Sequence, residues 1–341
     1  MTSASTTEAS AVVEVTALSR TFDVSKPWLN RVLERSPRAF LKAAQEISFS
    51  IDRGETFALV GESGSGKSTV AKMVVGLLEA SSGEIRIEGV DMRSRKQSGV
   101  EMRDLRRRIQ MIFQDPYASL NPRWRVDRII AEPIRAFALE KSEQAISARV
   151  GELLELVRLH PRDGAKYPHE FSGGQRQRIC IARALASKPE FLVCDEPTSA
   201  LDVSVQAQIL NLMKDLQDEF QLTYLFISHD LAVVRHMARR IGVMYLGRLV
   251  EVAESRDLFR NPRHPYTRML LAAIPDLEMT GQPRRAVEGE IPNPISPPTG
   301  CAFHPRCPLA NARCASELPV FRNDGGMGVA CHAVEEGRTA P

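Results

Sequence analysis

The sequence has no run of apolar residues close to the roughly 20 that a membrane-spanning helix needs. Its most apolar stretches, such as residues 269–275, are far too short for that role. The first fifteen residues lack the basic flank and apolar centre of a secretion signal, so we expect no signal peptide. Together these absences predict a protein that stays in the cytoplasm, where cysteines are kept reduced.

The chain also lacks a strong excess of either charge. Its 341 residues include 45 Lys and Arg against 42 Asp and Glu, a formal net charge of +3. Proteins dedicated to nucleic acid are usually far more basic, so we expect no nucleic-acid partner. Apolar residues make up 43% of the chain, which is enough to build a core. The length predicts about two domains, or one large domain with an appendage.

Three short apolar runs each end in residues that can bind a ligand. Residues 56–60 lead to a glycine-rich loop, residues 191–194 to two acids, and residues 224–227 to a serine and a histidine. Such runs are typical of strands that are buried on both faces. They predict an α/β fold with an open parallel sheet and helices on both sides. Ligands of such sheets bind at the carboxyl ends of the strands.

The remaining pattern predicts further strands and helices. We expect strands at residues 12–18 and 47–51, a helix from residue 67 to about 78, and mainly helical structure over residues 127–159. One buried helix face would consist of Val150, Leu153, Leu154 and Val157. Residues 23–42 are rich in Arg and Lys, and an amphipathic face there would consist of Trp28, Leu29, Val32 and Leu33.

Composition also predicts where the domains end. Residues 1–11 are small and polar, which favours a disordered N-terminus. After about residue 262 the chain becomes rich in proline. We therefore expect one large domain over residues 12–260 and a small Pro- and Cys-rich region over residues 261–341.

Residues 61–69 read GESGSGKST and match the pattern G-x-x-x-x-G-K-[ST]. Glycines let backbone N–H groups point at a phosphate, and the following helix adds the positive end of its dipole. Lys67 would reach the β- and γ-phosphates, and the Ser68 hydroxyl would bind Mg²⁺. The alternative is a plain glycine-rich turn, which the preceding strand and following helix disfavour. The residues expected to bind the nucleotide here are Gly61, Glu62, Ser63, Gly64, Ser65, Gly66, Lys67, Ser68 and Thr69.

A second candidate phosphate site reads FSGGQRQR at residues 171–178. Ser172 and Gln175 have the spacing of a capping box, so a plain helix start is one interpretation. Gly173 and Gly174, however, are costly in a first helical turn unless something approaches the backbone closely. A phosphate at this helix N-terminus would account for them.

The run FLVCDEPTSALD, residues 191–202, ends a buried strand in two acids. Asp195 is placed to hold Mg²⁺ through its water shell, and Glu196 to orient or deprotonate an attacking water. An acidic strand end on the surface is the alternative. The glycine-rich loop at residues 61–69 favours the catalytic interpretation.

The loop, FSGGQ, the DE-ended strand, SALD and SHD occur in this order, and together they resemble the nucleotide-binding subunit of an ATP-binding cassette (ABC) transporter. The resemblance covers residues 12 to about 260. It implies a P-loop NTPase core with a parallel sheet, an antiparallel β subdomain, and a helical signature subdomain at about residues 115–180. It also implies that two such domains pair head to tail and enclose ATP between them.

The resemblance assigns roles to further residues. The partner's ATP would be contacted by Ser172, Gly173, Gly174 and Gln175. Gln114, in MIFQDP, would sense Mg²⁺ and water and couple to the membrane subunits. His229 would contact the γ-phosphate, and Asp202 would communicate across the dimer. Phe22 is the candidate to stack on adenine, although about twenty extra residues separate it from the next strand.

Two local segments resemble one transporter class in particular. They are QDPYASLNPRWRV, residues 114–126, and NPRHPYTRMLLAAIP, residues 261–275, which leads to GCAFHPRC. Both are similar to the ATPase subunits of oligopeptide and dipeptide importers. That implies two membrane permease subunits, a sister ATPase or second copy, an extracytoplasmic solute-binding protein, and a peripheral place on the cytoplasmic face of the cell (inner) membrane. Members also carry nickel, glutathione, opines and sugars, so the solute stays open.

Four cysteines crowd the last 41 residues: Cys301, Cys307, Cys314 and Cys331. Reduced thiolates suit a [4Fe–4S] cluster or Zn²⁺, and a metal could hold this proline-rich segment folded. Some ATPases of the oligopeptide class have an iron–sulfur cluster in this region, so we expect iron–sulfur, with zinc or no metal as alternatives. Cys180 and Cys194 lie in apolar contexts and are expected in the core.

Other ATPases of the same superfamily act in DNA repair and chromosome organisation. Those proteins carry long coiled-coil insertions, whereas only 57 residues lie between Gln114 and Ser172 here, without sustained heptads. Translation-associated members carry two motif sets in one chain, and this chain has one. An inactive interaction subunit is disfavoured because Glu196, His229 and the signature motif are all present.

Overall fold

The computed structural model describes residues 11–35, 37–92, 99–273, 289–324 and 327–338. The chain divides into two compact units, which are described separately. Among the described residues, the first unit consists of residues 11–12, 51–56 and 99–228, and the second of those within 13–50, 57–92 and 229–338. The sequence-based boundary at residue 260 and the helical subdomain over residues 115–180 stay predictions.

The first unit contains three parallel strands. They are β6 (Ile109–Ile112), β7 (Phe191–Asp195) and β8 (Thr223–Ile227), with β7 paired to both neighbours. Every residue of β7 and β8 is buried. This confirms the prediction of buried parallel strands at these two apolar runs.

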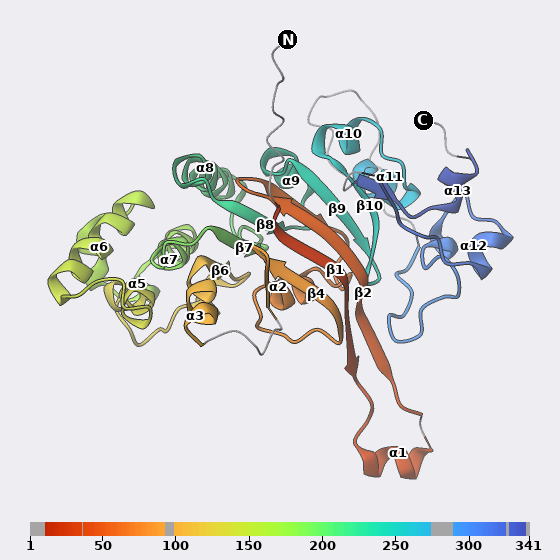
Figure 1. Ribbon diagram of the computed structural model, residues 1–341, viewed down its shortest axis with the longest axis horizontal. Helices are drawn as coiled ribbons and strands as arrows, with labels where there is room; N and C mark the ends of the chain where they lie inside the picture. The colour runs from red at the N-terminus through yellow and green to blue at the C-terminus, as the bar shows by residue number, and fades with distance from the viewer. Residues whose placement is uncertain (1–10, 36, 93–98, 274–288, 325–326, 339–341) are drawn as a thin grey trace. The chain divides into compact units, whose positions relative to one another are not determined.

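Helices of the first unit lie either beside these strands or farther out, toward the left of Figure 1. They are α3 (Gly99–Arg108), α4 (Pro116–Ser119), α5 (Val126–Ala136), α6 (Glu143–Leu156), α7 (Gly173–Leu185) and α8 (Val203–Phe220), with the 3-10 turns η1 (Pro161–Ala165) and η2 (Pro168–Glu170). The predicted apolar face of α6 is buried as expected at Val150, Leu153, Leu154 and Val157. Helices α5 and α6 are 11 and 14 residues long, too short for the coiled coil of a DNA-repair ATPase.

The second unit contains a parallel strand pair that continues into antiparallel strands. Strand β3 (Thr56–Val60) runs parallel to β9 (Arg240–Tyr245), and β9 pairs antiparallel with β10 (Arg248–Glu254). Two short strands follow beside β10, namely β12 (Met327–Val329) and then β11 (Arg322–Asp324). The mixed strand directions agree with the predicted P-loop α/β fold.

A separate four-stranded sheet in the second unit forms the predicted antiparallel β part. Its order is β2-β1-β4-β5, from β1 (Ala11–Asp23), β2 (Phe40–Asp52), β4 (Ser82–Ile87) and β5 (Val90–Asp91). Strands β1 and β4 are antiparallel, as are β4 and β5. Residues 1–10 of the expected disordered N-terminus lie outside the described residues, and Ala11 already belongs to β1.

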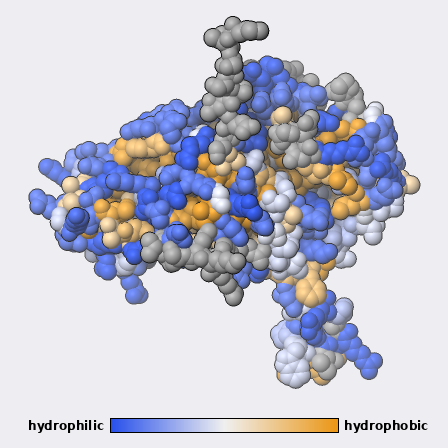
Figure 2. Space-filling model, viewed as in Figure 1, coloured by the Kyte–Doolittle hydropathy of each residue, from blue (hydrophilic) through white to orange (hydrophobic). Residues whose placement is uncertain are grey.

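Strands β1 and β2 form a long hairpin with helix α1 (Trp28–Glu34) at its end (Figure 1). The segment forms a helix, and its described apolar side chains are exposed. Trp28 is 68% exposed and Leu33 is 78% exposed. Figure 2 shows hydrophilic and hydrophobic residues mixed on this tip. The amphipathic face that the sequence predicts here is therefore exposed at Trp28, Leu29 and Leu33.

Short helices complete the second unit. They are α2 (Lys67–Val74), α9 (Leu231–Met237), α10 (Ser255–Arg260), α11 (Pro265–Ala272), η3 (His304–Arg306), α12 (Ala312–Ser316) and α13 (His332–Glu335). Helix α2 ends four residues before the predicted end at residue 78. No helix within the described ranges has both the length and the apolar character needed to cross a membrane.

Candidate functional site

The glycine-rich loop at residues 61–66 connects β3 to α2, as the motif predicts. Gly61 has φ +149°, and a Cβ there would lie 2.2 Å from the Met244 carbonyl oxygen. Gly66 has φ +101°, and a Cβ there would lie 2.1 Å from the Ala43 carbonyl oxygen. Side chains at these two positions would therefore clash with neighbouring backbone. The loop can keep this tight shape only with glycine at both of its ends.

Lys67 lies at the start of α2 and is 5% exposed. Its ammonium donates to the carbonyl oxygens of Gly61 at 2.8 Å and Glu62 at 2.9 Å, and to Ser65 Oγ at 3.3 Å. The cation thus lies within the curve of its own loop. A triphosphate bound there would offer this ammonium stronger, negatively charged acceptors. Ser68 and Thr69 follow Lys67 in the first turn of α2.

Glu62 has two anchors that sequence reasoning missed. Its backbone N–H donates to Tyr266 Oη at 2.9 Å. Its carboxylate accepts from both terminal nitrogens of Arg306, at 2.8 and 3.0 Å. Glu62 was predicted only as a nucleotide contact within the loop. No pattern in the sequence pairs it with a residue 244 positions away.

The acids that follow β7 lie where the motif places them. Asp195 ends the strand and is 4% exposed. Glu196 has φ +45°, and its N–H donates to the Ile227 carbonyl at the end of β8. The amide nitrogen of Gln114 donates to Glu196 Oε2 at 2.9 Å. Two predicted catalytic residues, 82 positions apart in sequence, are therefore in direct contact.

The signature segment begins helix α7 with a complete capping box. Ser172 Oγ accepts from the Gln175 N–H at 3.4 Å, and Gln175 Oε1 accepts from the Ser172 N–H at 3.0 Å. Both side chains are exposed. A Cβ on Gly174 would lie 2.4 Å from Val205 Cγ1, whereas one on Gly173 would meet Leu201 only at 3.4 Å. Close packing of α7 on α8 therefore explains Gly174 without a phosphate.

The other predicted nucleotide residues lie at the ends of strands and helices. Asp202 is the exposed N-cap residue of α8. His229 is exposed and follows β8, while Asp230 beside it caps α9 through the N–H groups of Ala232 and Val233. Phe22, on β1, has the Arg20 guanidinium 4.6 Å from its ring centroid. One face of this ring is therefore already occupied by a side chain of its own strand.

The structure does not support the predicted iron–sulfur site. Burial, with a smaller contribution from the neighbouring thiols of Cys331, Cys314 and Cys307, raises the pKa of the Cys301 thiol to about 11. The pKa values of Cys307 and Cys331 are also raised by burial. Within the described part of the chain, no group of three or more His, Cys, Asp or Glu side chains is arranged to hold a metal ion.

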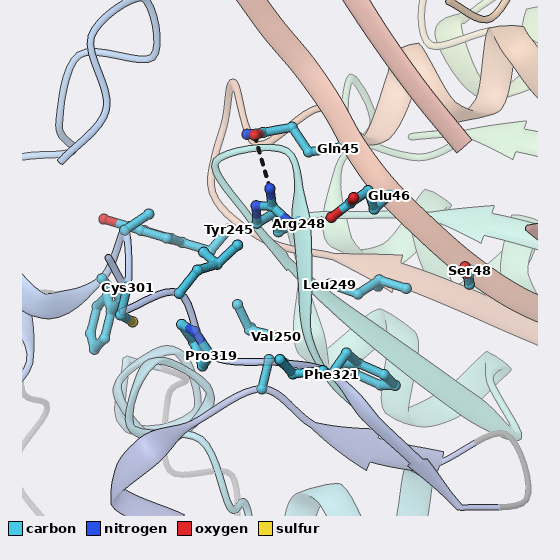
Figure 3. Close-up of a pocket in the computed structure, with 15 residues that line it drawn as sticks. Gln45, Glu46, Ser48, Tyr245, Arg248, Leu249, Val250, Cys301, Pro319 and Phe321 are labelled. Carbon is cyan, nitrogen blue, oxygen red and sulfur yellow. Dashed lines mark hydrogen bonds and ion pairs between the residues drawn. The ribbon is translucent and has the colours of Figure 1, made fainter. Parts of the chain in front are cut away.

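A cavity of about 440 Å³ lies in the second unit (Figure 3). Its walls come from β2, from the β9–β10 hairpin and from residues 301–303 and 318–321. The polar groups in its wall bind one another, since Arg248 donates to the Glu46 carboxylate at 3.1 Å and to the Gln45 amide oxygen at 3.3 Å. Nothing in the cavity resembles a phosphate site.

Comparison with known proteins identifies the family. Residues 44–199 match the ABC transporter family, and residues 250–314 match the family described as the oligopeptide/dipeptide transporter, C-terminal region. The oligopeptide transport ATP-binding protein OppF of Salmonella typhimurium is 45% identical over 330 residues, which cover 95% of this chain and 96% of OppF. This chain belongs to the ABC transporter family. It is an ATP-binding subunit of the type that carries the oligopeptide/dipeptide C-terminal region.

Other ABC transporter subunits are similar along most of their length. The oligopeptide transport ATP-binding protein AppF of Bacillus subtilis is 48% identical over 86% of this chain and 89% of its own. The di/tripeptide transport ATP-binding protein DppF of Pseudomonas aeruginosa is 48% identical over 87% of this chain and 92% of its own.

Solved structures of ABC cassettes share the fold. The ATP-binding cassette MJ0796, in a dimeric post-hydrolysis state bound to ADP and Pi, matches with a TM-score of 0.61 at 27% identity. That match covers 72% of this chain and 99% of the other. CbiO1 from Clostridium perfringens matches with a TM-score of 0.60, also at 27% identity, over 74% of this chain and 91% of its own.

Proposed function

We propose that this ABC subunit hydrolyses ATP to drive peptide import across the cytoplasmic membrane. The hydrogen bond between Gln114 and Glu196 carries the catalytic part of this proposal. It orients a carboxylate at the end of a buried strand, where an attacking water would be activated. The phosphate loop carries the binding part of the proposal, because its backbone curves tightly around the Lys67 ammonium.

Hydrolysis needs a base, charge neutralisation and a fixed nucleophile. Glu196 would accept a proton from water as the water oxygen bonds to the γ-phosphorus and the bridging β–γ bond breaks, leaving ADP and phosphate. The Gln114 amide donates to one carboxylate oxygen of Glu196, and this hydrogen bond fixes the orientation of the whole carboxylate group. Lys67 would offset the phosphate charge. His229 would contact the γ-phosphate.

ATP hydrolysis of this kind uses Mg²⁺. The residues that would hold the ion are Ser68, Gln114 and Asp195, whose hydroxyl, amide and carboxylate oxygens are the donors a hard cation prefers. Once bound, the ion neutralises charge on the phosphate oxygens. Asp195 is buried at the end of β7, which keeps its carboxylate in place.

The signature residues would act on a second subunit. Their exposed capping box leaves Ser172 and Gln175 accessible at a helix N-terminus, which favours a negatively charged ligand. We propose that they cap the triphosphate of a partner ATPase, either a sister subunit or a second copy, with Asp202 at the same interface. Phe22 would stack on the adenine.

The transport context follows from the relatives. They are named for oligopeptide and di/tripeptide transport, and their similarity extends through the C-terminal region. We therefore propose two permease subunits and an extracytoplasmic peptide-binding protein as partners, and a peripheral position on the cytoplasmic face of the inner membrane. Purification of the subunit from membranes in mild detergent, with identification of the permease that accompanies it, tests this assignment.

Replacement of the catalytic base tests the chemical step. Glu196→Gln should keep ATP binding but lower turnover by about 100-fold or more, the contribution expected of a general base. Glu190→Gln, at the other end of β7, is the matched control and should hydrolyse ATP like the wild type. Phosphate release and ATP-dependent dimerisation are the measurements. Wild-type turnover in Glu196→Gln would remove this carboxylate from the reaction.

A further inference from the structure

One carboxylate of the phosphate loop is held by an arginine from the C-terminal region. Arg306 lies in η3 and places both terminal guanidinium nitrogens on the two oxygens of Glu62, at 2.8 and 3.0 Å. The Arg306 side chain is 2% exposed and that of Glu62 is 19% exposed. This is the parallel, two-bond geometry that makes arginine–carboxylate pairs strong and directional.

Aromatic rings fix the position of this arginine. The guanidinium carbon lies 5.8 Å from the ring centroid of Tyr245 and 5.9 Å from that of Phe303. These two rings meet edge to face, with centroids 5.3 Å apart. Arg306 also donates to Tyr245 Oη at 3.4 Å. These contacts hold the flexible Arg306 side chain in one orientation, so forming the ion pair costs little further conformational entropy.

A second anchor holds the backbone of the same loop residue. Tyr266 is fully buried and its hydroxyl accepts the Glu62 N–H at 2.9 Å. Tyr266 lies in the first turn of α11, which His264 caps through Nδ1. The His264 N–H in turn donates to the buried carboxylate of Glu251 on β10. The Tyr266 hydroxyl is therefore positioned by the hydrogen bonds that start α11.

Glu62 is consequently held at three separate groups. Its carboxylate meets Arg306, its N–H meets Tyr266, and its carbonyl oxygen accepts from Lys67. Two of these three partners come from beyond residue 260. The first turn of the phosphate loop is thus supported by the C-terminal region as well as by β3 and α2.

We propose that Arg306 is a positioning residue for nucleotide binding, acting through Glu62. It would do so in two ways. It would fix the loop in the curve that receives the triphosphate, and it would neutralise a carboxylate within a loop that binds a highly negative ligand. Without the guanidinium, Glu62 would keep its charge and repel the phosphates.

This proposal rests on the proposed ATPase function, and its test separates the two. Arg306→Gln should raise the KM for MgATP about tenfold, equivalent to about 1.4 kcal/mol, while kcat changes much less because Glu196 and Gln114 are intact. Arg306→Lys keeps the charge but loses the paired geometry, so an intermediate KM is expected. Arg313→Gln is the control, because that arginine pairs with Glu317 and Glu336, away from the loop.

A double-mutant cycle with Glu62→Gln gives the decisive comparison. If Arg306 acts through Glu62, then Arg306→Gln should have little further effect on KM in the Glu62→Gln background. Binding of a fluorescent ATP analogue and thermal unfolding, measured on all variants of the full chain, separate affinity from folding. Because the double variant leaves no buried unpaired charge, it should fold even if Arg306→Gln alone does not.

The outcomes distinguish the hypotheses. An equal rise in KM on both backgrounds, or an Arg306→Gln variant with wild-type affinity, would overturn the positioning role. Absence of ATP binding in the wild type would instead contradict the proposed function. A loss of stability with unchanged KM would make the ion pair purely structural and would likewise overturn the proposal.

Discussion

The phosphate loop and the signature helix start both present backbone N–H groups near glycines, but they are built differently. The signature start is complete within four residues, since Ser172 and Gln175 cap each other. The phosphate loop depends on distant segments. Its Glu62 is held by Tyr266 and Arg306, which are 204 and 244 positions away.

The two sites should therefore differ in how they tolerate changes of sequence. A local motif keeps its shape wherever the helix beneath it is intact. A loop with distant anchors responds to changes in residues that never touch the nucleotide.

Low pH should lower the stability of the folded protein through His264, the residue that caps α11 and so helps to position Tyr266. Burial lowers the pKa of this histidine from 6.5 to about 3, so the folded state keeps it neutral. The unfolded chain takes up the proton first, and stability should fall as the pH drops below about 6.5, by about 2 kcal/mol at pH 5. His264→Asn retains a capping side chain but should reduce this loss.

Glu251 complicates the pH profile because burial raises its pKa, which favours the folded state in acid. The difference between wild type and His264→Asn isolates the histidine. Urea unfolding between pH 5 and pH 7 measures it. Parallel pH profiles for the two proteins would show that the His264 imidazole does not contribute.

Packing beneath the signature helix should be sensitive at one glycine and tolerant at the next. Gly174→Ala places a Cβ 2.4 Å from Val205 Cγ1, so we expect a net loss of about 1–2 kcal/mol after the gain in helix propensity. Gly173→Ala has 3.4 Å to Leu201 and should cost much less. Thermal unfolding of the two variants measures the contrast, which equal melting temperatures would refute.

Loss of the signature cap should have a modest effect on stability. Ser172→Ala removes an N-cap hydrogen bond and should cost about 1 kcal/mol. Ser142→Ala removes the equivalent cap of α6 and should cost a similar amount. Only Ser172→Ala should also reduce ATP turnover, since only Ser172 belongs to the signature. Equal turnover in the two variants would count against its proposed contact with ATP.

The sequence predicts best those parts of the fold that are determined by residues within the element itself. Strand β3 runs over Thr56–Val60 as the apolar run indicates, and β7 and β8 differ from prediction by one residue each. The capping box of α7 is likewise evident from four residues. In these cases the side chains that determine the element lie within it.

The parts that sequence does not predict depend on tertiary packing. The spacing of Trp28, Leu29 and Leu33 indicates a helix, but not that it lies at the end of a hairpin with no core to cover. The close packing of Gly174 against Val205 is a second reason for glycine at this position, and the sequence does not reveal it. Pairing of Glu62 with Arg306 requires the fold to bring η3 to the loop.

The ion pair between Glu62 and Arg306 bears on which fragment of this protein would be the smallest with full ATPase activity. All five nucleotide motifs lie before residue 231, so a fragment ending near residue 260 would carry every one of them. Such a fragment would still lack the tyrosine and the arginine that steady Glu62. A truncated or chimeric version of this subunit should therefore keep the residues after position 260.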